Sequence, residues 1–157
     1  MANFIKTEDL QRQQLLLFHD PKIEKLISPE KSIHVGRSGE LFTRSKLFSW
    51  GFTNDDSERH QAHDVTWYDG IDNVLVRIQV KTKEHSSDKM TFNFQKYKKG
   101  DFDIAACVSL EDRKVLFSPG VVNSITYRLN DFHNLNELDT FKRSLSFLKD
   151  QREVNNG

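Results

Sequence analysis

Hydrophobic residues near the end of the chain recur with the period of a helix. The stripe comprises four residues: Leu138, Phe141, Leu145 and Leu148. This spacing predicts a C-terminal helix at 134–150 with one apolar face. Asn134, with Glu137 three residues later, is expected to cap its first turn. Such a stripe is more often core than subunit interface, and both interpretations stay open.

Residues 37–50 are also expected to form a helix, with Ser38 as its N-cap and Gly51 as a left-handed residue at its end. Closer to the N-terminus, a helix is expected at 7–18, and a short helical piece at 23–27 follows the break at Asp20-Pro21.

Runs of β-prone residues predict strands in the middle of the chain. Residues 63–68 and 74–81 flank a turn and are expected to form a β-hairpin. The polar segment 53–62 is expected to be an exposed loop. Three further strands are predicted, at 90–94, 102–110 and 114–118. This order of elements indicates an α/β fold class.

Length and composition favour one globular domain. The 157 residues suit a single domain, which we divide into an N-terminal helical extension (1–35), a core (36–118) and the C-terminal helix (134–150). Lys and Arg number 23, as do Asp and Glu, which excludes a protein that coats nucleic acid through a global positive charge. Any basic site must therefore be local.

The chain shows no signal for a membrane or an oxidising compartment. Its longest pure apolar run is Leu15 to Phe18, and its first residues lack the regions of a signal peptide. We expect a cytoplasmic protein of bacterial or phage-like type. The single cysteine, Cys107, excludes an internal disulfide and cysteine-based zinc sites, and is expected to be a core residue.

The hairpin has one register that separates apolar from polar side chains. If Asp64 lies opposite Gln79, then Val65 meets Ile78 on one face. The other face then carries Asp64, Gln79 and Lys81 together. A shift by one residue would place Asp64 opposite Ile78, so we predict the first register.

These groups suit metal-assisted hydrolysis of a phosphodiester. The carboxylate of Asp64, the amide oxygen of Gln79 and the carbonyl of Val80 are oxygen ligands of the kind Mg²⁺ prefers, with Mn²⁺ as a substitute. Lys81 is expected to orient or deprotonate the attacking water, or to balance developing negative charge. Glu40 is the expected fourth member, either as a metal ligand or as an anchor for one.

Local charge separates along the chain. Residues 77–99 contain seven basic and two acidic residues, whereas residues 53–73 contain six acidic and one basic residue. A basic stretch with interleaved aromatic residues can contact phosphates, although a solvated surface loop is the alternative. Six residues are candidate DNA contacts: Arg44, Arg77, Lys83, Lys96, Lys98 and Lys99. Arg44 is also placed to pair with Glu40.

Taken in order, Gly39-Glu40, His63-Asp64 and Gln79-Val80-Lys81 resemble the motif of the PD-(D/E)XK nuclease superfamily. The likeness runs from about residue 36 to 118. The Gln-X-Lys form and the short chain are similar to small homing endonucleases of group I introns, with archaeal Holliday junction resolvases as a second resemblance. The superfamily implies a mixed sheet flanked by helices and Mg²⁺-dependent cleavage of double-stranded DNA by homodimers or homotetramers.

Two residues depart from the superfamily pattern. His63 replaces a proline that shapes a turn, and Gln79 replaces a carboxylate, which lowers the negative charge of the expected cation site. The alternatives to a site-specific endonuclease are therefore a structure-selective nuclease and a catalytically silent DNA-binding module. A zinc site at His60, His63 and His85 is a weaker interpretation than solvated histidines.

Overall fold

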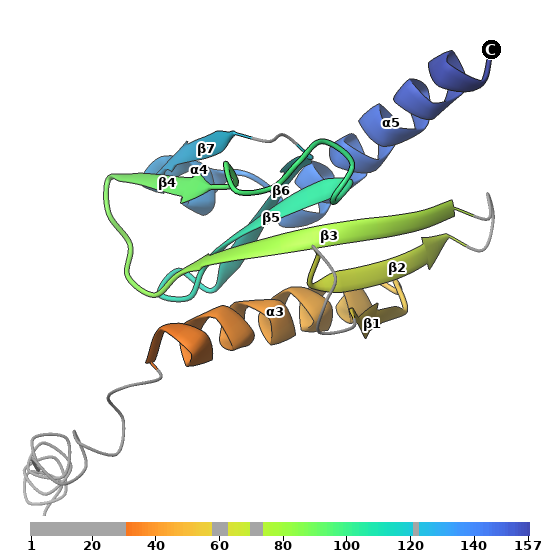
Figure 1. Ribbon diagram of the computed structural model, residues 1–157. Helices are drawn as coiled ribbons and strands as arrows, with labels where there is room; N and C mark the ends of the chain where they lie inside the picture. The colour runs from red at the N-terminus through yellow and green to blue at the C-terminus, as the bar shows by residue number, and fades with distance from the viewer. Residues whose placement is uncertain (1–30, 58–62, 70–73, 121–122) are drawn as a thin grey trace, which may run out of the picture. The chain divides into compact units, whose positions relative to one another are not determined.

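The computed structural model describes residues 31–57, 63–69, 74–120 and 123–157 (Figure 1). The chain divides into two compact units, Met1–His34 and Val35–Gly157, and both sheets lie in the second. The helices predicted at 7–18 and 23–27 fall outside the described residues.

A five-stranded mixed sheet forms the centre of the second unit. Its strands, in spatial order, are β1 (Asn54–Asp56), β2 (Val65–Asp69), β3 (Val74–Lys83), β5 (Ile104–Ser109) and β6 (Lys114–Pro119). The β3–β5 pair is parallel and the other neighbours are antiparallel. The predicted hairpin and the strands at 102–110 and 114–118 are confirmed. The loop predicted at 53–62 is wrong at its start, because Asn54–Asp56 extends the sheet beyond β2.

The strand predicted at 90–94 exists but does not join the main sheet. It is β4 (Lys89–Asn93), and it pairs with β7 (Ser124–Arg128) in a separate two-stranded antiparallel sheet. We call this pair the β4–β7 ribbon. Strand β7 was not predicted.

Three helices complete the described fold: α3 (Lys31–Ser49), α4 (Leu129–Asn134) and α5 (Glu137–Asn156). Helix α3 begins before residue 37, so Ser38 lies inside it and is not its cap. Gly51 has φ +88°, which confirms the left-handed residue after this helix. The predicted C-terminal cap is displaced, because Asn134 ends α4 and the side chain of Asn136 accepts from the Asp139 N–H.

Two apolar cores lie on opposite faces of the main sheet. The helix-side core joins Leu47 of α3 and Phe141 of α5 to one set of strand residues, including Val65 and Ile78. The ribbon-side core joins Phe92 of β4 and Phe132 of α4 to the alternate set, including Ala105, Cys107 and Leu116. Cys107 is fully buried, as predicted.

The helical stripe near the C-terminus is core rather than free surface. Phe141 is fully buried, and Leu145 and Leu148 pack against the helix-side core. None of the helices in the described ranges is long and apolar enough to cross a membrane.

Candidate active site at the open end of strand β2

From Val65 onward, the hairpin has the register that the alternation of its residues predicts. Val65 lies opposite Ile78 and Trp67 opposite Val76, all on the helix side. The Asp64 N–H donates to the Ile78 carbonyl at 2.9 Å, so the regular ladder stops at Val65 and the predicted pairing of Asp64 with Gln79 is not formed by the backbone. Because side chains alternate along a strand, Gln79 and Lys81 both belong to the ribbon side of β3.

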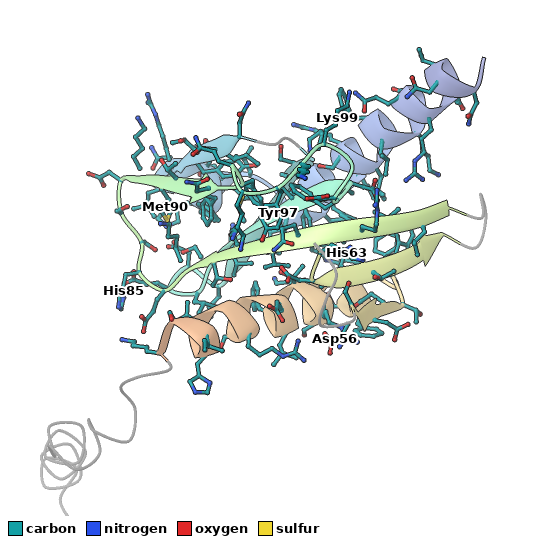
Figure 2. All side chains as sticks on the ribbon, viewed as in Figure 1. Asp56, His63, His85, Met90, Tyr97 and Lys99 are labelled. Atoms are coloured by element: carbon teal, nitrogen blue, oxygen red, sulfur yellow. The ribbon has the colours of Figure 1, made fainter. Side chains whose placement is uncertain are left out.

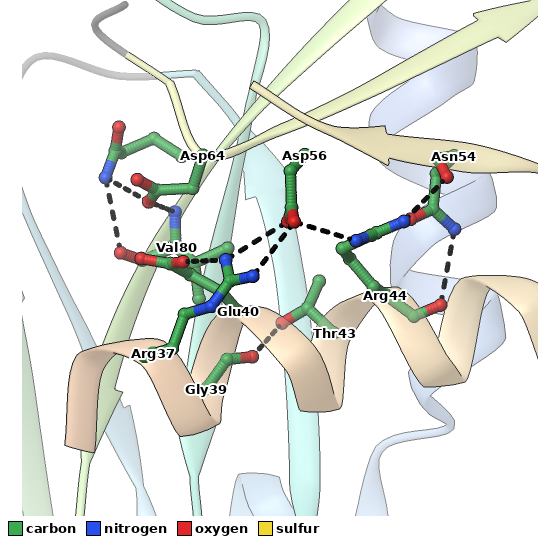
Figure 3. Close-up of polar contacts among 10 residues, drawn as sticks. Arg37, Gly39, Glu40, Thr43, Arg44, Asn54, Asp56, Asp64 and Val80 are labelled. Carbon is green, nitrogen blue, oxygen red and sulfur yellow. Dashed lines mark hydrogen bonds and ion pairs between the residues drawn. The ribbon is translucent and has the colours of Figure 1, made fainter. Parts of the chain in front are cut away.

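Strand β3 runs past the end of β2 and leaves one backbone position open. The N–H and C=O of a strand residue point to the same side, and at Val80 that side lies beyond the first residue of β2. The Asp64 carboxylate fills the place of the missing strand, since its Oδ2 accepts from the Val80 N–H at 2.9 Å (Figure 3). The Val80 carbonyl is consequently not used by β2.

The Gln79 side chain connects Asp64 and Val80 through its amide nitrogen. Its Nε2 donates to Asp64 Oδ2 and to the Val80 carbonyl, the latter at 3.3 Å. Gln79 is 4% exposed. The sequence predicts the amide oxygen as a cation ligand, whereas here the nitrogen faces both other oxygens. Gln79 becomes a ligand only if its amide rotates by half a turn.

A close contact between helix and sheet brings Glu40 to this position. A Cβ added to Gly39 would lie 1.8 Å from Thr82 Oγ1, so only glycine allows α3 to approach β3 so closely here. Glu40 follows directly, and its charge reaches Asp64 strongly enough to raise the pKa of that carboxyl. Among the residues that the structure describes, none forms a hydrogen bond with the buried Thr82 hydroxyl.

An arginine that the sequence did not single out holds Glu40. Arg37 donates to Glu40 Oε2 at 2.8 Å and to both carboxylate oxygens of Asp56, at 3.1 and 2.9 Å (Figure 3). Hydrogen bonds from Arg37 lower the pKa of Asp56, so this carboxylate stays ionised. The expected pairing of Arg44 with Glu40 is wrong: Arg44 binds Asp56 at 3.0 Å and Asn54 instead.

Lysines meet at one aromatic ring beside the site. The Nζ of Lys81 lies 5.2 Å from the centre of the Tyr97 ring, and the Nζ of Lys96 lies 5.0 Å from it. Tyr97 is labelled in Figure 2. The charges of both lysines also lower the pKa of Asp64. Tyr97 thus fixes the ends of two flexible side chains near the Asp64 carboxylate.

Burial is the largest cause of the shifted pKa of Asp64. It raises the pKa of this carboxyl to about 6, against the opposing hydrogen bond from the Val80 N–H. Glu40 adds to the rise, whereas the two lysines reduce it. A carboxylate that is costly to ionise gains from any cation placed beside it.

The oxygen donors of this site are compatible with a hard divalent cation. Asp64, Glu40 and the Val80 carbonyl supply only oxygen, and Mg²⁺ is commonly held by one or two carboxylates with water completing its shell. Across the described ranges, no three His, Cys, Asp or Glu side chains are placed to hold a metal ion. The cation would therefore depend on two carboxylates and a backbone oxygen.

The remaining predicted DNA contacts lie in different settings. Arg77 is held by Asp103, with Nε donating at 3.0 Å and its backbone N–H at 2.8 Å. Lys83, Lys98 and Lys99 are exposed. His85 is exposed, as predicted, and His60 lies outside the described residues.

Sequence reasoning missed Arg37, Asp56 and Tyr97. Arg37 lies three positions before Glu40, a spacing that favours a helical ion pair, so a signal for it was present. Nothing local indicates Asp56, because it reaches Arg37 only after β1 pairs with β2. Tyr97 belongs to the aromatic residues interleaved with the basic stretch 77–99, and nothing in the sequence marks it among them.

Comparison with known proteins identifies a fold. No family model and no curated protein match the chain. A solved structure, the bacterial homing endonuclease I-Ssp6803I, matches it with a TM-score of 0.50 and 14% sequence identity, covering 78% of this chain and 96% of that one. The fold resembles a homing endonuclease's. The mixed sheet of this chain, flanked by helices, agrees with the architecture that the resemblance implied.

Proposed function

We propose that this protein is a metal-dependent endonuclease that hydrolyses phosphodiester bonds of double-stranded DNA, with a PD-(D/E)XK active site. The observation that carries the proposal is the Asp64 carboxylate at the open edge of β3, hydrogen-bonded to Val80 and in the electric field of Glu40 and Lys81. The fold shared with a homing endonuclease supports it.

Each residue has a chemical role in this proposal. Asp64, Glu40 and the Val80 carbonyl would hold Mg²⁺, with Mn²⁺ as a substitute and Gln79 as a further ligand after rotation of its amide. The bound cation would supply a Lewis acid that offsets charge on the phosphate. Lys81 Nζ orients the attacking water, accepts its proton or balances negative charge as the phosphate becomes pentacovalent.

Site-specific cleavage of both strands, as in homing, is the form of activity we favour. One small site cuts one strand, so a double-strand break is most simply made by two copies related by a two-fold axis. We therefore propose a homodimer or homotetramer on DNA. The exposed cations Lys83, Lys96, Lys98 and Lys99 would contact phosphates.

A catalytically silent DNA-binding module is the second candidate. It is favoured by the Gln79 amide, whose nitrogen lies between two oxygens that a cation would need. In such a module the Gln79 amide would take the place of the cation as the hydrogen-bond partner of Asp64 Oδ2. The variant Gln79→Glu separates the candidates, because it restores a carboxylate at this position.

The test is a cleavage assay on labelled duplex DNA from the protein's own genomic neighbourhood and on a synthetic four-way junction. Each substrate is incubated with Mg²⁺, with Mn²⁺ and with chelator, using the full chain and Lys81→Ala. Metal-dependent cutting at one duplex site supports the proposal. Cutting of the junction alone points to a structure-selective nuclease. Binding without cutting, with activity gained in Gln79→Glu, indicates the silent module.

A further inference from the structure

The β4–β7 ribbon has two faces of opposite chemistry. Met90 and Phe92 of β4 are buried, and Ile125 and Tyr127 of β7 pack beside them against the ribbon-side core. Every alternate residue of both strands is exposed. The inner face therefore anchors the ribbon to the main sheet, and the outer face is left to solvent.

The outer face carries hydrogen-bonding and cationic side chains and no carboxylate. Six residues form three cross-strand pairs: Lys89 with Arg128, Thr91 with Thr126, and Asn93 with Ser124. The hydroxyls of the central threonine pair lie 3.0 Å apart. Lys89 and Arg128 give this face two positive charges, and the Asp131 carboxylate of α4 lies beside Arg128, where it accepts from the backbone N–H at 2.6 Å.

Duplex DNA is the partner that this shape and charge fit. Its major groove admits a two-stranded β-ribbon, and the edges of its base pairs present donors and acceptors to the side chains that enter. Arginine and lysine bind guanine, and hydroxyl groups bind either kind of edge. Side chains perpendicular to a ribbon can thus meet successive base pairs, while the absence of carboxylates among the six residues limits repulsion by the phosphates.

The ribbon is also connected to the candidate active site. The segment that follows Asn93 of β4 carries Lys96 and Tyr97. The Lys81 Nζ lies over the Tyr97 ring, and the charge of Lys96 acts on the Asp64 carboxyl. Beneath the ribbon, Cys107 belongs to its core and is the β5 partner of Lys81. The ribbon and Lys81 therefore share one side of the main sheet.

From these observations we infer that the outer face of the β4–β7 ribbon reads base pairs in the major groove of duplex DNA beside the cleaved phosphate. The inference rests on the proposed function, to which it adds the residues that select the sequence. Arg128 and the pair Thr91–Thr126 are the expected reading residues. Asn93 also serves the turn that follows β4, since its Oδ1 accepts from the Gln95 N–H at 2.8 Å.

The test selects bound DNA from a pool of duplexes with a randomised centre, in chelator so that no cleavage occurs. The full chain is compared with Arg128→Ala and with Thr91→Val/Thr126→Val, which keeps the β-branched shape and removes both hydroxyls. Arg143→Ala is the matched control, because it removes one exposed arginine from α5, a helix of the helix-side core. Thermal unfolding midpoints verify that each variant is folded.

The wild-type chain is expected to enrich one motif. Arg128→Ala should bind that motif about tenfold more weakly and lose preference at one or two base pairs. The threonine double variant should change the preferred bases at neighbouring positions, and Arg143→Ala should retain the motif. Binding of unrelated duplex at low salt should change by less than about threefold in every variant.

Three results would overturn the inference: an unchanged motif in both folded ribbon variants, no motif in the wild type, or ribbon variants that alter only the oligomeric mass. The last would assign the ribbon to self-association. The nuclease proposal is judged separately by cleavage with Mg²⁺. A motif that depends on the ribbon, without any cleavage, would refute the nuclease and leave only the reading of base pairs by the ribbon.

Discussion

The two faces of the main sheet differ in how completely they are closed by apolar side chains. On the helix side, Leu47 and Phe141 cover a continuous row of strand residues, and aromatic rings such as Phe52 and Trp67 pack edge to face at 5.0 Å. On the ribbon side, the core also contains Phe92 and Phe132, but Gln79 and Lys81 interrupt the same face of β3.

This difference shows where a sheet protein can place chemistry at a moderate cost in stability. The helix side has no room for a charge, since its strand residues are almost fully buried. The polar residues gather where β2 ends and β3 continues, because Val80 already needs a partner there for its N–H. Asp64 satisfies this backbone group and so adds a carboxylate without leaving a polar group unpaired.

The largest expected effect is a loss of cleavage activity when Lys81, on the ribbon side of the main sheet, is replaced. Lys81→Ala should reduce metal-dependent cleavage by roughly a hundredfold to a thousandfold, since it removes charge stabilisation at the reacting phosphate. Single-turnover cleavage of the duplex substrate measures this change. Lys142→Ala removes an exposed lysine from α5 and should leave the rate unchanged. A rate near that of the wild type in Lys81→Ala would exclude Lys81 from the site.

The next effect is on stability and concerns the helix side. Gly39→Ala should lower the free energy of unfolding by about 1–3 kcal/mol, because the new methyl group meets Thr82. Gly36→Ala is the matched control on the same helix, since nothing lies within 4 Å of its added Cβ. It should raise stability by about 0.5–1 kcal/mol. Equal denaturant midpoints for the two variants would disprove the close crossing of α3 and β3.

The pH dependence of stability should reveal the cost of burying Asp64. Its pKa is about 6 in the folded chain and 3.8 when unperturbed, so between these values the folded state binds the extra proton. The free energy of unfolding should therefore fall as the pH rises from 4 to 6, by at most about 1.4 kcal/mol per pH unit from this group.

Urea unfolding across this range, compared with Asp64→Asn, measures that slope. The asparagine variant keeps the shape of the side chain but cannot titrate, so its profile should be flatter by the contribution of one proton. Identical profiles for the two proteins would show that Asp64 ionises as easily in the folded chain as in the unfolded one.

The smallest expected effect is the change in the free energy of unfolding when either of the two arginines that bind Asp56 is removed. Arg37→Ala should change the free energy of unfolding by less than about 1 kcal/mol, because its ion pairs are exposed to solvent. Arg44→Ala should cost more, since Arg44 is half-buried and also donates to the Asn54 carbonyl at 3.0 Å. Chemical denaturation of both variants tests this order, and a larger loss in Arg37→Ala would reverse it.

The sequence predicted those parts of the fold that depend on neighbouring residues. The β2–β3 hairpin, the β5–β6 pair and the C-terminal helix follow from alternation, turns and helical spacing. Helix boundaries were less accurate, because the first residues of α3 are mostly exposed and no apolar pattern marks its start. Strand β7 alternates clearly, but its partner β4 lies far away along the chain.

The sequence likewise predicted only those site residues that depend on neighbouring positions. Asp64, Gln79 and Lys81 could be grouped from the sequence, since alternation separates them from the apolar residues Val65 and Ile78. Arg37 and Asp56 could not be joined, because their contact requires both the α3 crossing and the pairing of β1. The orientation of the Gln79 amide was likewise beyond the sequence, which shows the amide but not which end meets Asp64.

By itself the sequence determined the hairpin and the side chains that share its polar face, because alternation and the cost of burying a charge act over a few residues. The sequence also suggested Glu40 as the fourth member, but only the tertiary structure decided how it is placed, since this depends on the missing Cβ of Gly39 at the crossing with Thr82. It also decided that β4 leaves the main sheet for β7, because that pairing needs an apolar face for the ribbon to cover.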